Sequence, residues 1–317
     1  MLEFQITQEY LGFSNHLVFL APLYEECLKS DTYAFGEGST VAKITDGTLL
    51  PNTYKAIAGV ANIGDDVNWC GHPFAQANWY AFGRLAWDNM LTSGQIADEW
   101  IRMTFTEDVN FVNPVKAMML ASREAAVNYM MPLGLHHLFA WGHHYGPQPW
   151  CDVPGARPDW LPRYYHKAAT DGIGFDRTRS GSGAVDQYHP PLNELYNNLN
   201  SCPEKYLLWF HHVPLDYKMK NGRILWDELC YKYQEGIDTV RSFQKTWFHV
   251  QSLIDKQRAL EVEAKLKIQA HDAVWWRDAC LLYFQTFSKR PIPAELEQPV
   301  GKLDSLMQIK LDLKHTN

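Results

Sequence analysis

Three carboxylates follow two short apolar segments, and their type and spacing suggest acid–base chemistry. Glu9 closes residues 1–12, where apolar and polar residues alternate as in a half-buried strand. Asp65 and Asp66 follow the small apolar residues of the segment 56–64. Carboxylates at the tips of neighbouring parallel strands can share one site, where one protonates a glycosidic oxygen and the other activates water or attacks the sugar. The alternatives are a solvated Glu9 and an Asp pair that caps the next helix.

Other reactive side chains lack the spacing of a known site. Histidine doublets occur at 136–137, 143–144 and 211–212, but adjacent side chains point in different directions and no HExxH spacing accompanies them. We therefore expect structural histidines or contacts to sugar hydroxyls rather than a zinc site. The six cysteines form no CxxC, which predicts separate thiols and favours a reducing compartment. The sequence has no GxSxG, GxGxxG or Walker motif, so neither a nucleophilic serine nor a nucleotide site is predicted.

The composition of the 317 residues narrows the class of protein. A net charge of −7 without basic clusters disfavours a nucleic-acid partner. No apolar run reaches membrane-spanning length and no signal sequence is visible, so we expect no membrane partner and favour a cytoplasmic or periplasmic protein. Aromatic residues make up 14% of the chain, with 12 Trp and 16 Tyr. Aromatic faces line carbohydrate sites, although large cores and interfaces also use them.

The elements that would position these residues are two strand–helix units followed by helices. Helices are predicted at 14–28 (with a late start or kink at Pro22), 73–87, from a capping box at 92–95, at 113–131, 224–254 and 255–287. The strand at 56–64 is predicted to be buried on both faces. Two parallel strands cannot close a barrel, so we expect the last two units of a barrel whose earlier units lie upstream. A long irregular segment, 133–219, is expected to be functional.

Five long motifs resemble the α-glucuronidases of glycoside hydrolase family 67. They are QITQEYLG at 5–12, GVANIGDD at 59–66, NWYAFGRLAW at 78–87, GHHYGP at 142–147 and CPEKYLLWFHHVP at 202–214. The resemblance spans nearly the whole chain except about its last dozen residues.

The resemblance implies an α/β part followed by a mainly α part. Residues 1–90 would be the end of a (β/α)8 TIM barrel, with the first strand as its seventh, and residues 91–317 a helical domain that also makes a homodimer. Enzymes of this family release glucuronic acid or its 4-O-methyl derivative from the terminal non-reducing xylose of xylo-oligosaccharides. They invert the anomeric configuration and use neither metal nor cofactor.

The resemblance also assigns roles to single residues. Glu9 would be the general base, together with an Asp at the end of the preceding strand. That Asp and the general-acid Glu would lie upstream of Met1, so the 317-residue chain is expected to have little activity alone.

Further residues would contact the substrate. Trp150 or Trp160 would reach over the barrel mouth onto the methyl group of the uronic acid, with His143, Tyr145 and Asp65 beside it. The alternatives are that these residues only pack the helical domain, that the enzyme acts on another sugar, or that the chain is an oligomerisation and substrate-mouth module.

Overall fold

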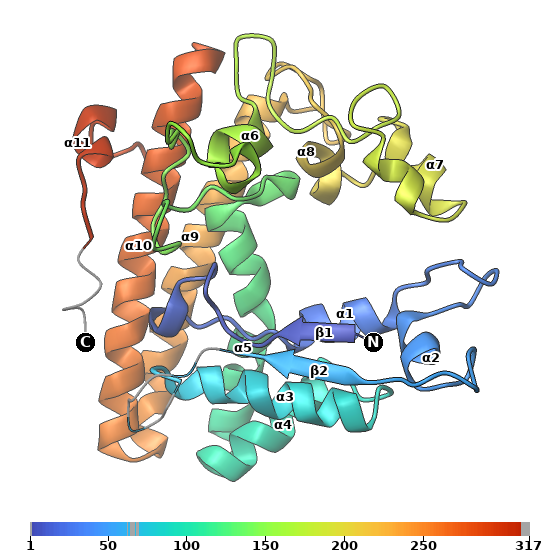
Figure 1. Cartoon of the computed structure of the whole chain (residues 1–317). Helices are drawn as coiled ribbons and strands as arrows, with labels where there is room; N and C mark the ends of the chain where they lie inside the picture. The colour runs from blue at the N-terminus through green and yellow to red at the C-terminus, as the bar shows by residue number, and fades with distance from the viewer. Residues whose placement is uncertain (1, 62, 64–66, 68–69, 312–317) are drawn as a thin grey trace. The chain divides into compact units, whose positions relative to one another are not determined.

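The computed structural model describes residues 2–61, 63, 67 and 70–311 (Figure 1). The chain divides into two compact units. The first unit contains Met1–Ala125 and Thr239–Ala270, and the second contains Ala126–Asp238 and His271–Asn317. The fold is a small parallel sheet with helices, followed by a mainly helical part, as the sequence predicts.

The sheet of the first unit joins β1 (Leu2–Gln5) to β2 (Ile57–Val60) in parallel, with Leu2 opposite Ile57. The N–H of Ile6 donates to the carbonyl of Val60 at 2.8 Å, which extends the pairing by one residue. The prediction of two successive parallel units is therefore confirmed. Both strands are shorter than predicted.

β2 is less buried than its apolar sequence suggests. Val60 is 48% exposed, and Ile57 and Ala58 are only half-buried. Within the described chain, the prediction of a strand buried on both faces is wrong, because none of the four residues of β2 is fully buried. Gly59 serves close packing: a Cβ there would lie 2.5 Å from Cδ1 of Ile6.

Besides the two strands, the first unit contains several short helices. They are η1 (Phe13–Asn15), α1 (Ala21–Lys29), α2 (Val41–Thr45), η2 (Pro73–Ala75), α3 (Gln76–Trp87), α4 (Ser93–Thr104) and η7 (Gln251–Leu253). Pro22 lies in the first turn of α1, which confirms the predicted late start. Thr92 and Gln95 form the predicted capping box of α4.

Three long helices contribute residues to both units: α5 (Val109–Met130), α9 (Leu225–Val250) and α10 (Lys256–Ser288). Figure 1 shows α9 and α10 side by side. Their bounds lie close to the predicted ones.

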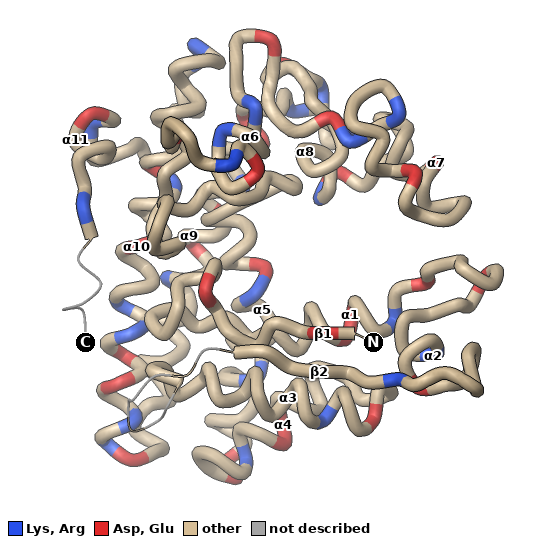
Figure 2. The backbone as a smooth tube through the Cα atoms, viewed as in Figure 1, with Lys and Arg blue, Asp and Glu red and all other residues tan. Residues whose placement is uncertain are grey.

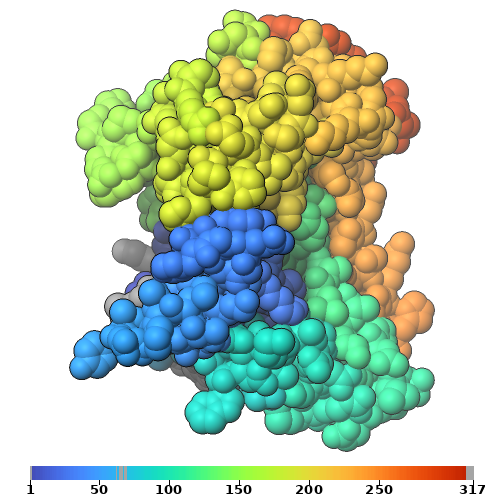
Figure 3. Space-filling model, turned by 90° about the vertical axis from the view of Figure 1, so that its right-hand side faces the viewer, coloured from blue at the N-terminus to red at the C-terminus, as the bar shows by residue number. Residues whose placement is uncertain are grey.

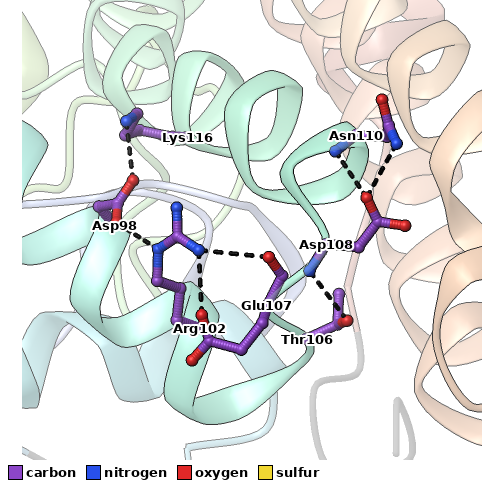
Figure 4. A network of polar contacts seen from close by, with 7 residues as sticks. All are labelled: Asp98, Arg102, Thr106, Glu107, Asp108, Asn110 and Lys116. Atoms are coloured by element: carbon purple, nitrogen blue, oxygen red, sulfur yellow. Dashed lines mark hydrogen bonds and ion pairs between the residues drawn. The ribbon is translucent and has the colours of Figure 1, made fainter.

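α5 begins four residues earlier than the predicted start at Asn113. Asp108 causes this difference, because its carboxylate accepts from the N–H of Asn110 at 2.9 Å (Figure 4). The same view shows Asp98 of α4 between Arg102, at 2.6 Å, and Lys116 of α5, at 2.9 Å. The pair between Asp98 and Lys116 joins α4 to α5, whereas the pair between Asp98 and Arg102 lies within α4.

An aromatic cluster fills the core of the first unit. Phe74, Trp100, Phe105, Phe111 and Trp247 lie with neighbouring ring centroids 5.4–6.4 Å apart. Several pairs meet edge to face, the preferred geometry for aromatic rings. Much of the high aromatic content is thus used for packing.

The second unit contains the irregular segment and its short helices. These are η3 (Pro132–Gly134), η4 (Pro158–Trp160), α6 (Pro162–His166), η5 (Ala184–Gln187), α7 (Leu192–Asn197), η6 (Glu204–Tyr206), α8 (Leu207–Phe210) and α11 (Leu303–Met307). Val185, Cys202 and Phe210 form a small core below Tyr188 and Tyr196. Figure 3 shows α7 and its neighbouring turns as a continuous yellow surface.

Charge is spread over the described chain, with Lys and Arg interspersed among Asp and Glu (Figure 2). The structure describes all six cysteines, and none of them forms a disulfide, as predicted. Among the described residues, no helix is both long and apolar enough to cross a membrane.

Candidate active site

Glu9 lies in a turn beyond the end of β1, not at the strand tip itself. The carbonyl oxygen of Gln8 closes this turn by accepting from the N–H of Leu11 at 2.8 Å and of Phe13 at 3.0 Å. Gly12 has φ 84°, and a Cβ there would lie 2.1 Å from the ring of His16. Only glycine fits this position. The turn therefore holds Glu9 half-exposed.

The Gln8 side chain also organises the turn. Gln8 is only 6% exposed, and its Nε2 donates to the carbonyl of His16 at 2.9 Å. Its Oε1 accepts from Nδ2 of Asn78 at 3.3 Å. Both ends of the Gln8 amide are thus satisfied, as a buried amide requires.

The chain after the turn is a buried extended segment whose backbone pairs with side chains. Gln269 of α10 accepts from the N–H of Leu17 at 3.0 Å and donates to its carbonyl at 3.1 Å. Ser122 of α5 accepts from the N–H of Phe19 at 2.8 Å. Since a buried backbone group without a partner is costly, these side chains fix the segment.

Sequence reasoning missed Asn78, Ser122 and Gln269. Each is a buried polar residue on the apolar stripe of its helix. A polar residue at an apolar position is the signal that could have identified them.

Tyr10, which neighbours Glu9, and His72, which interacts with His16, both have shifted pKa values. Burial raises the pKa of Tyr10, and the charge of Glu9 raises it further. Burial lowers the pKa of His72 to about 3, with Lys265 and His16 adding to the effect. His72 is therefore neutral near pH 7, and Nδ1 of His72 accepts from the N–H of Phe74 at 3.1 Å.

Asp65, the predicted substrate contact, lies outside the described residues, as does Asp66. Their predicted roles stay predictions. Within the described part of the chain, no group of three or more His, Cys, Asp and Glu residues is placed to hold a metal ion.

Trp160 carries an exposed aromatic surface in the second unit. It is 50% exposed, and its ring lies 6.1 Å from that of Trp141, which is 37% exposed. The Arg157 guanidinium lies over the Trp160 ring at 5.0 Å. We call Trp141 and Trp160 the tryptophan platform.

Two side chains fix the backbone of η4 below the platform. Nε2 of His137 donates to the carbonyl of Trp160 at 2.9 Å, and the hydroxyl of Tyr165 donates to that of Asp159 at 2.8 Å. His137 stacks on Tyr165 with ring centroids 4.8 Å apart. The turn that carries Trp160 is therefore held at two consecutive carbonyls.

A buried cation, Arg177, packs among aromatic rings in the same unit. Arg177 is 9% exposed, and its guanidinium lies 3.7 Å from the centroid of Trp209 and 4.4 Å from that of Phe175. Its Nη1 donates to the carbonyl of Trp209. His136 meets Trp209 edge to face at 5.1 Å, and burial lowers the pKa of His136 to about 4. These cation–π and edge-to-face contacts stabilise the packing of Trp209, Phe175 and His136 around the buried guanidinium.

The other predicted substrate residues are more enclosed than Trp160. Tyr145 is 6% exposed, and its hydroxyl donates to Oδ2 of Asp272 at 2.5 Å. Trp150 meets Tyr283 edge to face at 6.2 Å. Trp150 and His143 line a small pocket that is also lined by Trp275.

Glu9 belongs to the first unit, and Trp150, Trp160, His143 and Tyr145 belong to the second. The structure brings Trp150 and His143 together at one pocket and places Trp160 on the separate tryptophan platform.

The chain is similar to known proteins along most of its length. Residues 1–69 match the family model "Glycosyl hydrolase family 67 middle domain", and residues 70–297 match "Glycosyl hydrolase family 67 C-terminus". Alpha-glucuronidase A of Emericella nidulans is 37% identical over 297 residues, which cover 93% of this chain and 34% of the relative. Probable alpha-glucuronidase A of Aspergillus oryzae is 35% identical over 289 residues, covering 90% of this chain and 34% of the relative.

The chain thus spans about a third (34%) of the length of these relatives. The C-terminal model alone covers more than half of the chain, and the middle-domain model covers the segment that carries Glu9. The chain belongs to glycosyl hydrolase family 67.

Proposed function

We propose that this chain supplies the general base and a substrate-contacting surface of an α-glucuronidase. The reaction is removal of glucuronic acid or 4-O-methyl-glucuronic acid from xylo-oligosaccharides with inversion. The observation that carries the proposal is Glu9, a half-exposed carboxylate on a turn fixed by Gln8, in the segment that matches the family's middle domain. The relatives that match this chain are named alpha-glucuronidases.

In this mechanism Glu9 accepts a proton from the water that attacks the anomeric carbon. The attack comes from the face opposite the leaving xylose, so an α-linked uronate is released as the β anomer. A rigid turn suits this role, because a general base must lie within hydrogen-bond reach of the water. In this proposal the general acid is a carboxylate outside residues 1–317.

The tryptophan platform is the proposed surface for a sugar ring of the substrate. Trp160 offers a half-exposed ring, and His137 and Tyr165 fix the backbone that carries it. The C–H face of a sugar packs on such a ring. Trp150, Tyr145 and His143 then support the surrounding loop.

We further propose that residues 1–90 are the last two βα units of a (β/α)8 barrel and that residues 91–317 form a helical domain that makes a homodimer. The parallel pairing of β1 and β2 supports the first part. Sedimentation equilibrium of the 317-residue protein tests the second, since a homodimer has twice the mass of 36.6 kDa.

The activity test compares two proteins on an aldouronic acid that carries its uronate on the terminal non-reducing xylose. One is the 317-residue chain. The other is a fusion in which the part of the Emericella nidulans relative that precedes its region of similarity to this chain is placed before residue 1. We expect the fusion to release glucuronic acid, seen first as the β anomer by proton NMR, and the chain alone to be at least about 10²-fold slower.

Each other outcome corrects a stated part of the proposal. Initial release of the α anomer would contradict inversion. Cleavage of plain xylo-oligosaccharides in place of the aldouronic acid would show a different sugar specificity. An inactive fusion with a native circular dichroism spectrum would favour a non-catalytic module.

A further inference from the structure

Asn78 joins the two ends of the loop that carries Glu9. It lies on α3 and is fully buried, with 0% of its surface exposed. Its Nδ2 donates to Oε1 of Gln8 at 3.3 Å and to the carbonyl of Val18 at 2.9 Å. Its Oδ1 accepts from the N–H of Leu20 at 2.8 Å. The Asn78 amide thus contacts Gln8 before Glu9 in the chain, and Val18 and Leu20 after the loop.

These contacts leave the Gln8 side-chain amide no other orientation with the same hydrogen bonds. Its Nε2 is used by the carbonyl of His16, so its Oε1 must meet a donor. Asn78 supplies that donor. Without it, the Gln8 amide would have to rotate and give up the hydrogen bond to His16, or leave a buried oxygen without a hydrogen-bond partner, which is costly.

The Gln8 backbone transmits this constraint to Glu9. The carbonyl of Gln8 holds the N–H groups of Leu11 and Phe13, which close the turn around Glu9. A displaced Gln8 therefore displaces the turn. A general base that moves by about 1 Å can lose about 10²-fold in rate.

We propose that Asn78 is a positioning residue for Glu9 and acts through the Gln8 amide. The proposal rests on the proposed function in which Glu9 is the general base. Asn78 does not touch the reacting atoms; it sets the place of the residue that does.

The structural test uses amide hydrogen exchange on the 317-residue protein, which needs no activity. Asn78→Asp keeps the acceptor for Leu20 and removes both donors, and Asn78→Ala removes all three contacts. We expect the exchange rates of Leu11 and Phe13 to rise about tenfold or more in both variants. The matched control is Tyr80→Phe on the same helix, which loses the hydrogen bond of 2.8 Å to Glu99 and should leave both rates within about twofold.

The kinetic test uses the active fusion. Asn78→Asp should lower kcat about 10- to 100-fold while KM stays within about twofold, because the base is misplaced but the sugar contacts remain. Tyr80→Phe should keep kcat within about twofold. A purely structural role for Asn78 would lower the unfolding midpoint and leave kcat per folded enzyme unchanged.

Three results would overturn the proposal: unchanged exchange at Leu11 and Phe13, an unchanged kcat, or a kcat loss equal in Tyr80→Phe. A Glu9→Gln variant measured in parallel separates this proposal from the proposed function. If Glu9→Gln turns over normally, Glu9 is not the base. If Glu9→Gln is inactive and Asn78→Asp has wild-type kcat, only the positioning role fails.

Discussion

Trp150 and Trp160 are ten residues apart and have different surroundings. Trp160 is half-exposed on the tryptophan platform, whereas Trp150 packs against Tyr283 and lines a pocket with Trp275. The family resemblance offered both as candidates for the tryptophan that reaches over the barrel mouth. Exposure favours Trp160, since a ring already covered by protein has little surface left for a sugar.

This difference predicts that two alanine substitutions affect different properties, one the KM and the other the stability of the fold. Trp160→Ala should raise KM for the aldouronic acid about 3- to 10-fold and change the free energy of unfolding by less than about 1 kcal/mol. Trp150→Ala should destabilise the fold by about 1–3 kcal/mol, because it removes packing against Tyr283. Steady-state kinetics of the fusion and urea unfolding of the 317-residue chain measure the two effects. An unchanged KM in Trp160→Ala would remove this ring from the proposed substrate surface.

At the scale of elements, local patterns predicted most helices and the parallel strand pair. The capping box at Thr92 and the late start at Pro22 are visible because both signals lie within one helical turn. The buried segment after Glu9 could not be predicted in this way. Leu17 and Gln269 are 252 residues apart, and no local periodicity encodes such a contact.

The contact between Leu17 and Gln269 predicts a stability effect without a direct kinetic one. Gln269→Leu keeps a similar volume but leaves the N–H and carbonyl of Leu17 without their partner. We expect a loss of about 2–4 kcal/mol in the free energy of unfolding, because two buried polar groups lose their hydrogen bonds. Urea unfolding of the 317-residue chain measures this loss. A variant as stable as the wild type would show that the Gln269 side chain does not hold the segment.

At the scale of the whole molecule, buried histidines couple stability to pH. Nδ1 of His166 accepts from the N–H of Ala168 at 2.9 Å, and its Nε2 donates to the carbonyl of Pro149 at 2.7 Å. Both nitrogens are thus committed to the neutral ring. Burial lowers the pKa of His166 to about 4 from its ordinary value of 6.5.

This depressed pKa predicts weaker stability in mild acid. Between pH 6.5 and about 4 the unfolded chain binds a proton at His166 that the folded chain does not, so the free energy of unfolding falls as the pH falls. His166→Gln should be less stable at pH 7 but show a smaller decrease from pH 7 to pH 4.5. Urea midpoints of both proteins at several pH values measure the slope. Equal slopes would show that His166 does not contribute.

The candidate site was partly predictable at this scale. Glu9 and the aromatic loop could be named because their motifs are local and resemble a family. Gln8, Asn78 and the support under Trp160 could not, because they depend on which helices meet in the folded chain.

Whether Glu9 is the general base can be decided by a single measurement. It is the initial rate of β-glucuronic acid release from the aldouronic acid, followed by proton NMR, for the fusion with Glu9 and for its Glu9→Gln variant of equal unfolding midpoint. If Glu9 is the general base, this rate is about 10²- to 10⁴-fold lower in the variant. A variant that releases the β anomer at a near-normal rate would contradict this role.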